Sequence, residues 1–303
     1  MSMYYDNEFK NFEYLNSPNG GGITFALMTV TFVLISFFGQ AIVGAIFGTA
    51  NATYTLVCSC FPALTFLLVI LLFKSYTKIP LLKIVGVNKF NWLYVVLAVV
   101  VSASMLFGLG FVNDAFVNLL NKWGANIDGV NVPLDNVGQL LVCILTFALL
   151  PAVFEEFFFR GVLLNCLKGV KPIYAILTVG LCFALYHCSL AQLLYQFVYG
   201  AVLTALAIAC GSVIPCIIAH LLNNFTVILL EYFKVSINLY NPLYIVFGIL
   251  ALLTVCVFTV FAIKKKKAEQ TAKVRGFYAF ACVGFFVCLF LTFGSMLNSI
   301  LGG

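Results

Sequence analysis

Charge is what this sequence has least of. Asp, Glu, Lys and Arg together make up only 9% of its 303 residues, whereas they make up about 25% of an average soluble domain. Apolar residues account for 63%, and many of them occur in runs of roughly 18 or more, long enough to cross a bilayer as a helix. No stretch is left for a separate soluble core, so we expect a single transmembrane domain over residues 23–303.

Three further sequence features are also missing: cysteine pairs, a common zinc-protease motif and a signal peptide. The eleven cysteines form no CxxC pair and no secreted-type spacing, so we interpret them as small buried hydrophobes. The HExxH motif of many zinc proteases does not occur. No basic segment opens the first apolar run, which argues against a cleavable signal peptide. The polar residues before that run, including Asp6, Glu8 and Glu13, predict an N-terminal cytoplasmic tail over residues 1–22.

The net charge of +6 does not indicate a nucleic-acid partner. The basic residues occur in short loops between apolar runs, where they act as topology signals. We therefore expect the partners to be the lipid bilayer and a peptide or lipidated protein substrate.

What the chain does have is a series of about nine apolar runs. Each predicts a helix, because lipid offers the backbone no hydrogen-bond partners and the runs lack the alternation of barrel strands. The predicted fold is an all-α, polytopic transmembrane bundle of eight to nine spans. The run at 173–187 is short for a full crossing, and the last could be an appendage to an eight-helix core. The predicted spans are 23–48, 55–73, 91–113, 137–158, 173–187, 191–210, 213–231, 242–263 and 276–297.

The loop lysines and arginines predict the orientation. With the N-terminus in the cytoplasm, only Lys122 and Lys234 face outward, which is the asymmetry that membrane insertion favours. We therefore expect a multi-pass protein of a bacterial plasma membrane, with Glu155 toward the cytoplasmic side. The residues predicted to be cytoplasmic are Lys74, Lys78, Lys83, Lys89, Arg160, Lys168, Lys171, Lys264 to Lys267, Lys273 and Arg275.

Five groups capable of proton or metal chemistry occur within or at the ends of these apolar runs. A charged side chain at the centre of a membrane helix costs about 3 kcal/mol on insertion scales, so residues kept there are more often functional than incidental. The chain has only two histidines, and both belong to this group. Its members are Glu155, Glu156, Arg160, His187 and His220.

The fourth run places two glutamates and an arginine on one helix. Glu156 and Arg160 are four residues apart and share a face, while Glu155 points about 100° away. Paired with arginine, Glu156 suits a positioning role, whereas Glu155 suits a general base if it faces an apolar cavity. The alternative is a cluster at the helix end whose arginine extends to the lipid headgroups.

The histidines have i, i+4 partners of their own. Phe183 shares a helix face with His187, and His220 shares one with Asn224. A lone membrane histidine more often bonds one helix to another than catalyses, but three spans that each contribute such a group are harder to explain in that way. Asn223 is rotated away and suits packing support. Other residues that could line the same cavity are Tyr186, Gln192 and Gln196.

Three motifs thus follow one another on successive apolar runs: Glu155-Glu156-x-x-x-Arg160, Phe183-x-x-x-His187 and His220-x-x-x-Asn224. Together they resemble the pattern of the CAAX-processing and bacteriocin-processing intramembrane endopeptidases, the family of the Ras-converting CAAX endopeptidase. The resemblance covers about residues 137–231, the fourth to seventh spans, and no motif position departs from it.

The resemblance implies hydrolysis of a peptide bond in a membrane-associated, CAAX-like protein or a small peptide. Glu155 and His187 would activate a water, and His220 with Asn224 would stabilise the oxyanion. These roles supply the base and the donors that peptide hydrolysis needs, without a serine or cysteine nucleophile.

The other motif residues would support this chemistry. Glu156 and Arg160 would hold the site together, and Phe183 would contact the substrate. Members of the family are commonly described as metalloproteases, so a catalytic zinc ion with three protein ligands is one possibility. A metal-free, glutamate-based mechanism is the other. The zinc ligands would be Glu155, His187 and His220.

Two other classes of function stay open. A proton-coupled transporter would use the glutamates and histidines as a relay, but it predicts interrupted helices in both halves, and the first three spans have no counterpart. A bacteriocin self-immunity protein or other membrane partner would keep the same residues without catalysis.

Overall fold

The computed structural model describes residues 17–49, 52–124, 134–265 and 272–301. Within these ranges every regular element is a helix, and eight helices are long and apolar enough to cross a membrane. The predicted polytopic all-α bundle is therefore confirmed. Most of the predicted tail lies outside the described residues, as do Lys266 and Lys267.

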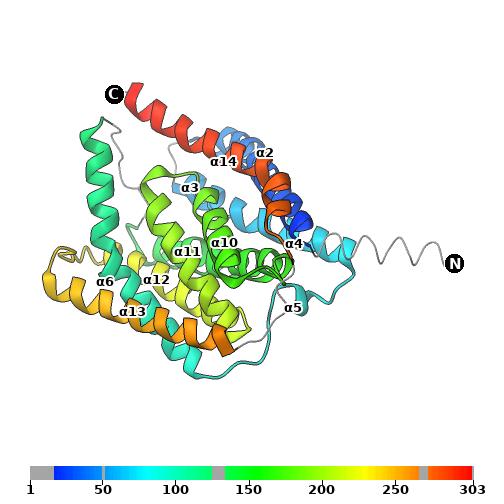
Figure 1. The fold of residues 1–303 in the computed structure, drawn as a ribbon. Coiled ribbons are helices and arrows are strands. Elements are labelled where there is room, and N and C mark those ends of the chain that lie inside the picture. Colours follow the sequence, from blue (N-terminus) through cyan, green and yellow to red (C-terminus); the bar gives the residue numbers. More distant parts are fainter. Residues whose placement is uncertain (1–16, 50–51, 125–133, 266–271, 302–303) are drawn as a thin grey trace.

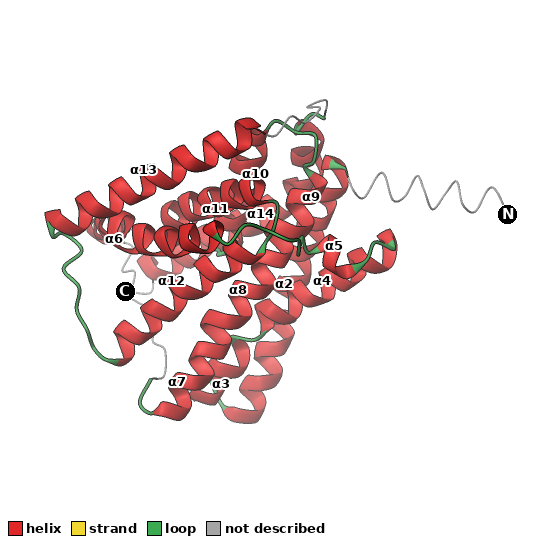
Figure 2. Ribbon diagram, turned by 90° about the horizontal axis from the view of Figure 1, so that it is seen from below, coloured by secondary structure: helices red, strands yellow, loops and turns green. Residues whose placement is uncertain are grey.

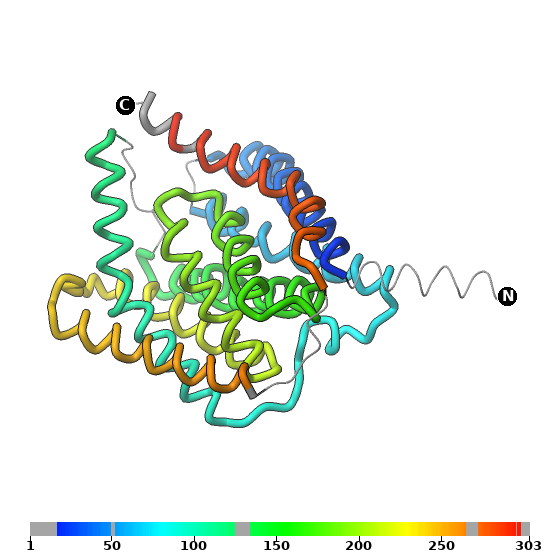
Figure 3. The backbone as a smooth tube through the Cα atoms, viewed as in Figure 1, coloured from blue at the N-terminus to red at the C-terminus, as the bar shows by residue number. Residues whose placement is uncertain are grey.

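The bundle has a centre and two flanking helix pairs. The centre consists of a segmented helix over residues 137–166 and three further helices: α10 (Pro172–Tyr186), α11 (Leu190–Cys210) and α12 (Ile214–Tyr232). Figures 1 and 3 show this centre between the two outer pairs. One pair is α2 (Pro18–Phe47) beside α14 (Arg275–Leu301), and the other is α6 (Leu93–Lys122) beside α13 (Pro242–Lys265).

The first helix begins at Pro18 rather than at residue 23. The Ser17 side chain accepts a hydrogen bond from the Gly20 backbone N–H at 3.4 Å, and Pro18 occupies the first turn, where its missing N–H costs nothing. Glycines that look like a loop in the sequence are therefore helical. Gly22 is needed there, because a Cβ would collide with the Phe277 backbone of α14.

The predicted second span is divided into α3 (Ala52–Cys58) and α4 (Phe61–Thr77), with a turn at Ser59 and Cys60. A four-residue helix, α5 (Leu81–Ile84), follows α4. Figure 2 shows α3 near the start of the segmented helix, at the end of the bundle away from α5. Leu56 of α3 packs there against the cluster around Leu140.

The segmented helix alternates between α and π geometry. Its parts are α7 (Val137–Cys143), η1 (Ile144–Leu149), α8 (Leu150–Glu156), η2 (Phe157–Leu163) and α9 (Leu164–Cys166), of which η1 and η2 are π-helical. Pro151 has no N–H to donate to the Phe147 carbonyl one turn earlier. The Asn224 side chain of α12 uses that carbonyl instead, at 3.1 Å. The proline thus opens a backbone acceptor to a neighbouring helix.

Helix α10 is too short to cross the apolar layer. Its 15 residues extend about 22 Å, less than the roughly 30 Å of a bilayer core. The chain reverses at His187, Cys188 and Ser189, and Cys188 adopts a left-handed φ of 47°. His187 follows the last residue of α10 and lies at the tight turn into α11.

The last helix belongs to the bundle. Gly284 of α14 packs against Phe25 and Thr29 of α2, with a Cβ at this position only 2.9 Å from either side chain. On the other side of α14, the Tyr278 hydroxyl lies 2.8 Å from that of Thr178 in α10. The expectation that the last span could be an appendage is therefore not supported by these contacts.

The charged helix ends are distributed unevenly. Lys122 and Lys234 lie at the end of the bundle where α6 and α12 finish. The opposite end, where α5 and the start of α6 lie (Figure 1), carries Lys78, Lys83, Lys89, Lys168 and Lys171. We call it the basic end. Its orientation toward the cytoplasm stays a prediction.

Candidate active site

Glu156 is the centre of a buried ion-pair network. Its Oε1 accepts a hydrogen bond from Arg160 Nη1 at 2.7 Å and lies 2.9 Å from His220 Nδ1. Arg160 is only 4% exposed, so it does not extend to the headgroups. The i, i+4 pairing expected from the sequence is present. In addition, the Glu156 carboxylate links the segmented helix to α12.

Arg160 is held by two further helices. Its Nη2 donates a hydrogen bond to the Gly200 carbonyl of α11 at 2.9 Å, and its guanidinium carbon lies 4.5 Å from the centre of the Phe183 ring in α10. The absence of a side chain at Gly200 permits the close packing of α11 on α10, since a Cβ would lie 3.1 Å from Phe183. A carboxylate, a carbonyl and an aromatic face compensate the buried charge.

Glu155 is buried as well but is held differently. It is 6% exposed, and its Oε2 has no hydrogen-bond partner among the described residues. Oε2 of Glu156 shares that property, but Glu156 is fixed through its other oxygen. Buried polar atoms are nearly always satisfied in proteins, and exceptions often have a functional cause. Glu155 therefore offers an oxygen that could bind a water or a substrate group.

His187 is fixed by its own helix. Its Nδ1 lies 2.7 Å from the Phe183 carbonyl, which can only accept, so Nδ1 carries the proton. Nε2 of neutral His187 is then a lone-pair acceptor. The ring also packs against Phe183 and Tyr186, at 4.9 and 5.8 Å between ring centres.

Phe183 separates the two histidines. Its ring lies 4.9 Å from His187 and 5.9 Å from His220, and it is fully buried beneath Arg160. In this position it acts as a spacer that fixes the other side chains. Its predicted contact with the substrate stays a prediction.

Asn224 completes the site on α12. Its Nδ2 donates to the Phe147 carbonyl at 3.1 Å, and its Oδ1 accepts from Asn223 Nδ2 at 3.4 Å. An amide nitrogen carries two protons, so one N–H of Asn224 is left for a further acceptor. Asn223 has the supporting role expected of it, and it also accepts from the Tyr195 hydroxyl at 3.0 Å.

Sequence reasoning missed two tyrosines of α11 and the Gly200 carbonyl. Tyr199 packs edge-on against the His220 ring at 5.8 Å, and Tyr195 holds Asn223. Their i, i+4 spacing on an apolar helix is a signal that could have found them. Gln192 and Gln196, which the sequence suggests as further cavity-lining residues, bond to each other at 3.5 Å.

The donors for a metal ion do not come together in this arrangement. Among the described residues, no three His, Cys, Asp or Glu side chains are grouped as a metal ion requires. The predicted ligands Glu155, His187 and His220 thus do not form such a group. We derive no step through a metal, and the zinc requirement stays a prediction.

Comparison with known families adds independent information. Residues 137–226 match the family model described as Type II CAAX prenyl endopeptidase Rce1-like. Over this segment the chain is similar to the Rce1-like family. No curated protein and no solved structure matches the chain.

The Rce1-like segment contains the whole candidate site. It begins with the segmented helix and ends within α12, two residues beyond Asn224. The Rce1-like family is a protease family. The described residues include eight apolar helices long enough to span a membrane, so the chain is an integral, multi-pass membrane protein with a segment similar to this protease family.

Proposed function

We propose that this protein is an intramembrane endopeptidase that hydrolyses a peptide bond with water activated by a glutamate and a histidine. The observation that carries the proposal is one cluster of four titratable groups. The segmented helix contributes two buried carboxylates, the turn after α10 contributes the half-buried His187, and α12 contributes the buried His220. Such groups are costly in an apolar bundle, and their convergence supplies what hydrolysis needs.

Glu155 is the proposed general base. Its unpartnered Oε2 suits a water, from which it would take a proton as the water attacks the scissile carbonyl. His187 assists at the same water. With Nδ1 committed to the Phe183 carbonyl, Nε2 is its reactive atom. In the proposed sequence Nε2 takes from Glu155 the proton removed from the water and delivers it to the leaving amine as the C–N bond breaks.

His220 and Asn224 are the proposed oxyanion donors. His220 Nδ1 faces the Glu156 carboxylate, so its Nε2 carries a proton only when the ring is an imidazolium. Glu156 would stabilise that charge. Asn224 contributes the N–H that the Phe147 carbonyl does not use. Donors fixed before the reaction stabilise a developing oxyanion most effectively.

Glu156 and Arg160 are positioning residues in this mechanism. Through them the segmented helix, α10, α11 and α12 are joined at one point. The Gly200 carbonyl and the Phe183 ring keep Arg160 in place, and Arg160 keeps Glu156 beneath His220. The geometry of the reacting groups therefore depends on contacts that never touch the substrate.

The proposed substrate is a membrane-associated, CAAX-like protein or a small peptide, cleaved on the cytoplasmic side of a bacterial plasma membrane. The family description supports a substrate that carries a C-terminal lipid. The apolar surroundings of the cluster suit a substrate that enters from the bilayer.

The test is cleavage of prenylated and unmodified CAAX-like peptides by the purified protein in vesicles. Glu155→Gln, His187→Ala and His220→Ala should each abolish cleavage without loss of protein from the membrane. Glu231→Gln is a matched control, because Glu231 lies exposed on α12. Full activity in Glu155→Gln would refute the mechanism. A bacteriocin-protection phenotype that persists in this variant would instead favour a non-catalytic membrane partner.

A further inference from the structure

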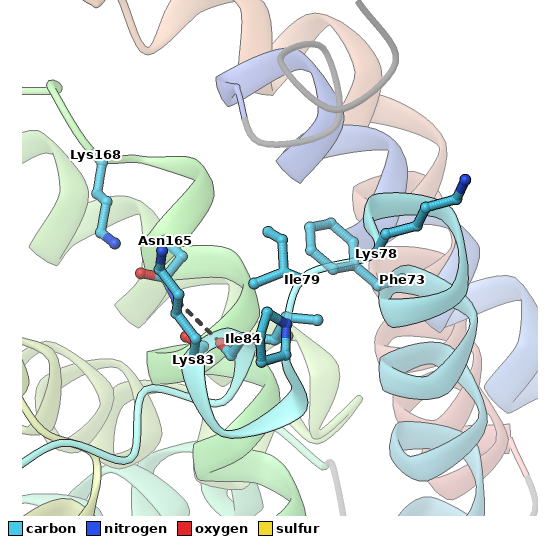
Figure 4. Close-up of a pocket in the computed structure, with 8 residues that line it drawn as sticks. Phe73, Lys78, Ile79, Lys83, Ile84, Asn165 and Lys168 are labelled. Atoms are coloured by element: carbon cyan, nitrogen blue, oxygen red, sulfur yellow. Dashed lines mark hydrogen bonds between the residues drawn. The ribbon is translucent and has the colours of Figure 1, made fainter. Parts of the chain in front are cut away.

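A pocket of about 250 Å³ lies at the basic end of the bundle, apart from the catalytic cluster. It is formed where the end of α4, helix α5 and the turn after α9 meet. Its apolar walls come from Phe73, Ile79 and Ile84, and Lys83 and Lys168 stand at its rim. Figure 4 shows Lys78 at the same pocket with its ammonium group turned away from the other two lysines.

The pocket is held open by specific contacts. Asn165 Nδ2 donates to the Ile84 carbonyl at 2.9 Å and lies 3.4 Å from the Lys83 carbonyl (Figure 4). Beside it, Gly161 meets the Val85 backbone so closely that a Cβ would lie 2.7 Å from it. These contacts fasten helix α5 to the segmented helix. The backbone positions of Lys83 and Lys168 are therefore fixed relative to each other.

The rim of the pocket is cationic and lacks a protein anion. None of the described residues that line it is acidic. Burial, and then the positive charge of Lys83, lower the pKa of Lys168. The two ammonium groups thus repel each other, and an anion bound between them would relieve the repulsion.

The surroundings place this pocket at the edge of the lipid. Tyr76 and Leu82 are 71% and 66% exposed, and Trp92 is 72% exposed. Exposed aromatic residues beside lysines at the ends of membrane helices mark the boundary between lipid and water. A ligand in the pocket would have its charged part among lysines and an apolar part beside Leu82.

We propose that this pocket binds the phosphate group of an anionic phospholipid, with Lys83 and Lys168 as the recognising cations. Basic pockets between membrane helices are a known mode of headgroup recognition. An anion with attached acyl chains matches both the cationic rim and the exposed apolar border. The site is independent of the proposed peptidase activity, because no residue of the catalytic cluster lines it.

The test is a titration of the detergent-purified, full-length protein with phosphatidylglycerol or phosphatidylcholine, followed by native mass spectrometry. The variant Lys83→Gln/Lys168→Gln should bind phosphatidylglycerol about 25-fold more weakly, from about fivefold per lysine. The matched control Lys122→Gln/Lys234→Gln changes two exposed lysines at the opposite end and should bind normally. Phosphatidylcholine binding should not respond to either variant.

A second variant separates charge from folding. Lys83→Arg/Lys168→Arg keeps both charges and should retain phosphatidylglycerol. Unchanged binding in the glutamine variant would overturn the proposal. So would displacement of the lipid by equal concentrations of inorganic phosphate, which would identify a free-anion site. A cleavage assay with peptides that end in a free carboxylate or in an amide identifies the other possible ligand. If the glutamine variant binds the lipid normally but no longer prefers the free carboxylate, the proposal is overturned and the pocket binds the C-terminus of the substrate.

Discussion

The centre of the bundle and its outer helix pairs are held together by different interactions. In the centre, helices meet through directional polar contacts, such as Glu156 with Arg160 and His220. The outer pairs meet through glycines: Gly22 of α2 lies against the α14 backbone, and Gly108 of α6 against Gly248 of α13. Small residues allow close packing of helices in lipid, where no hydrophobic effect drives association.

The difference shows where this chain carries specific information. The family match covers residues 137–226 and thus includes the centre but none of the outer pairs. An outer helix needs only apolar length and a few small residues, which many sequences satisfy. The centre needs particular side chains at particular positions. Substitutions in the centre should therefore reduce activity, whereas substitutions in an outer pair should reduce stability alone.

The largest expected effect is on activity alone. Glu155→Gln keeps the shape of the side chain but removes the proposed base, so we expect the rate of peptide cleavage to fall by about 10²- to 10⁴-fold. The thermal unfolding midpoint in detergent should stay close to wild type, because Oε2 of Glu155 has no partner to lose among the described residues. A variant that unfolds instead would assign Glu155 a structural role.

Substitution of Glu156, the next residue, should reduce both the cleavage rate and the thermal stability. Glu156→Gln removes the counter-charge of Arg160 and His220, and loss of one partner from a buried pair costs about 3 kcal/mol or more. We expect a lower unfolding midpoint together with loss of cleavage. Stability equal to wild type in Glu156→Gln would contradict the network.

Replacing Arg160 by Lys should partly reduce both the cleavage rate and the unfolding midpoint, since a lysine cannot reach both Glu156 and the Gly200 carbonyl in the same geometry.

A smaller effect, on stability alone, is expected in an outer pair. A Cβ at Gly108 would lie 2.6 Å from the Gly248 backbone, so Gly108→Ala should destabilise the protein by about 1 to 3 kcal/mol. Cleavage per folded molecule should not change. Gly294→Ala on α14 is the matched control, because no atom of the described residues lies within 4 Å of its Cβ position. Equal unfolding midpoints for the two variants would show that the α6–α13 contact tolerates a methyl group at Gly108.

Much of the fold follows from the sequence, because apolar runs of membrane length have few alternatives to helix. Boundaries follow less well where local chemistry extends a helix, as Ser17 and Pro18 do for α2. The turn at Ser59 and Cys60 within the second span has one local signal, Pro62 in the first turn of α4, but the apolar run continues across it.

The candidate site, too, follows from the sequence only in part. The Glu156–Arg160 pair is predictable, because residues four apart share a helix face. The Phe147 carbonyl could have been found as well, since Pro151 leaves it without its usual donor. The Gly200 carbonyl that holds Arg160 lies 40 residues away along the chain. Only the packing of α11 against α10 brings it near, and no local pattern encodes that approach.

The smallest expected effect is that of metal removal on the cleavage rate. Glu155, His187 and His220 do not form a three-ligand group among the described residues, so we expect cleavage to survive a strong chelator. Metal analysis of the purified protein, alongside the same assay, provides the check. Zinc at one ion per chain, whose removal abolishes cleavage in wild type, would instead identify these three side chains as ligands. In that case Glu155→Gln should lower zinc content as well as activity, whereas Glu231→Gln should change neither.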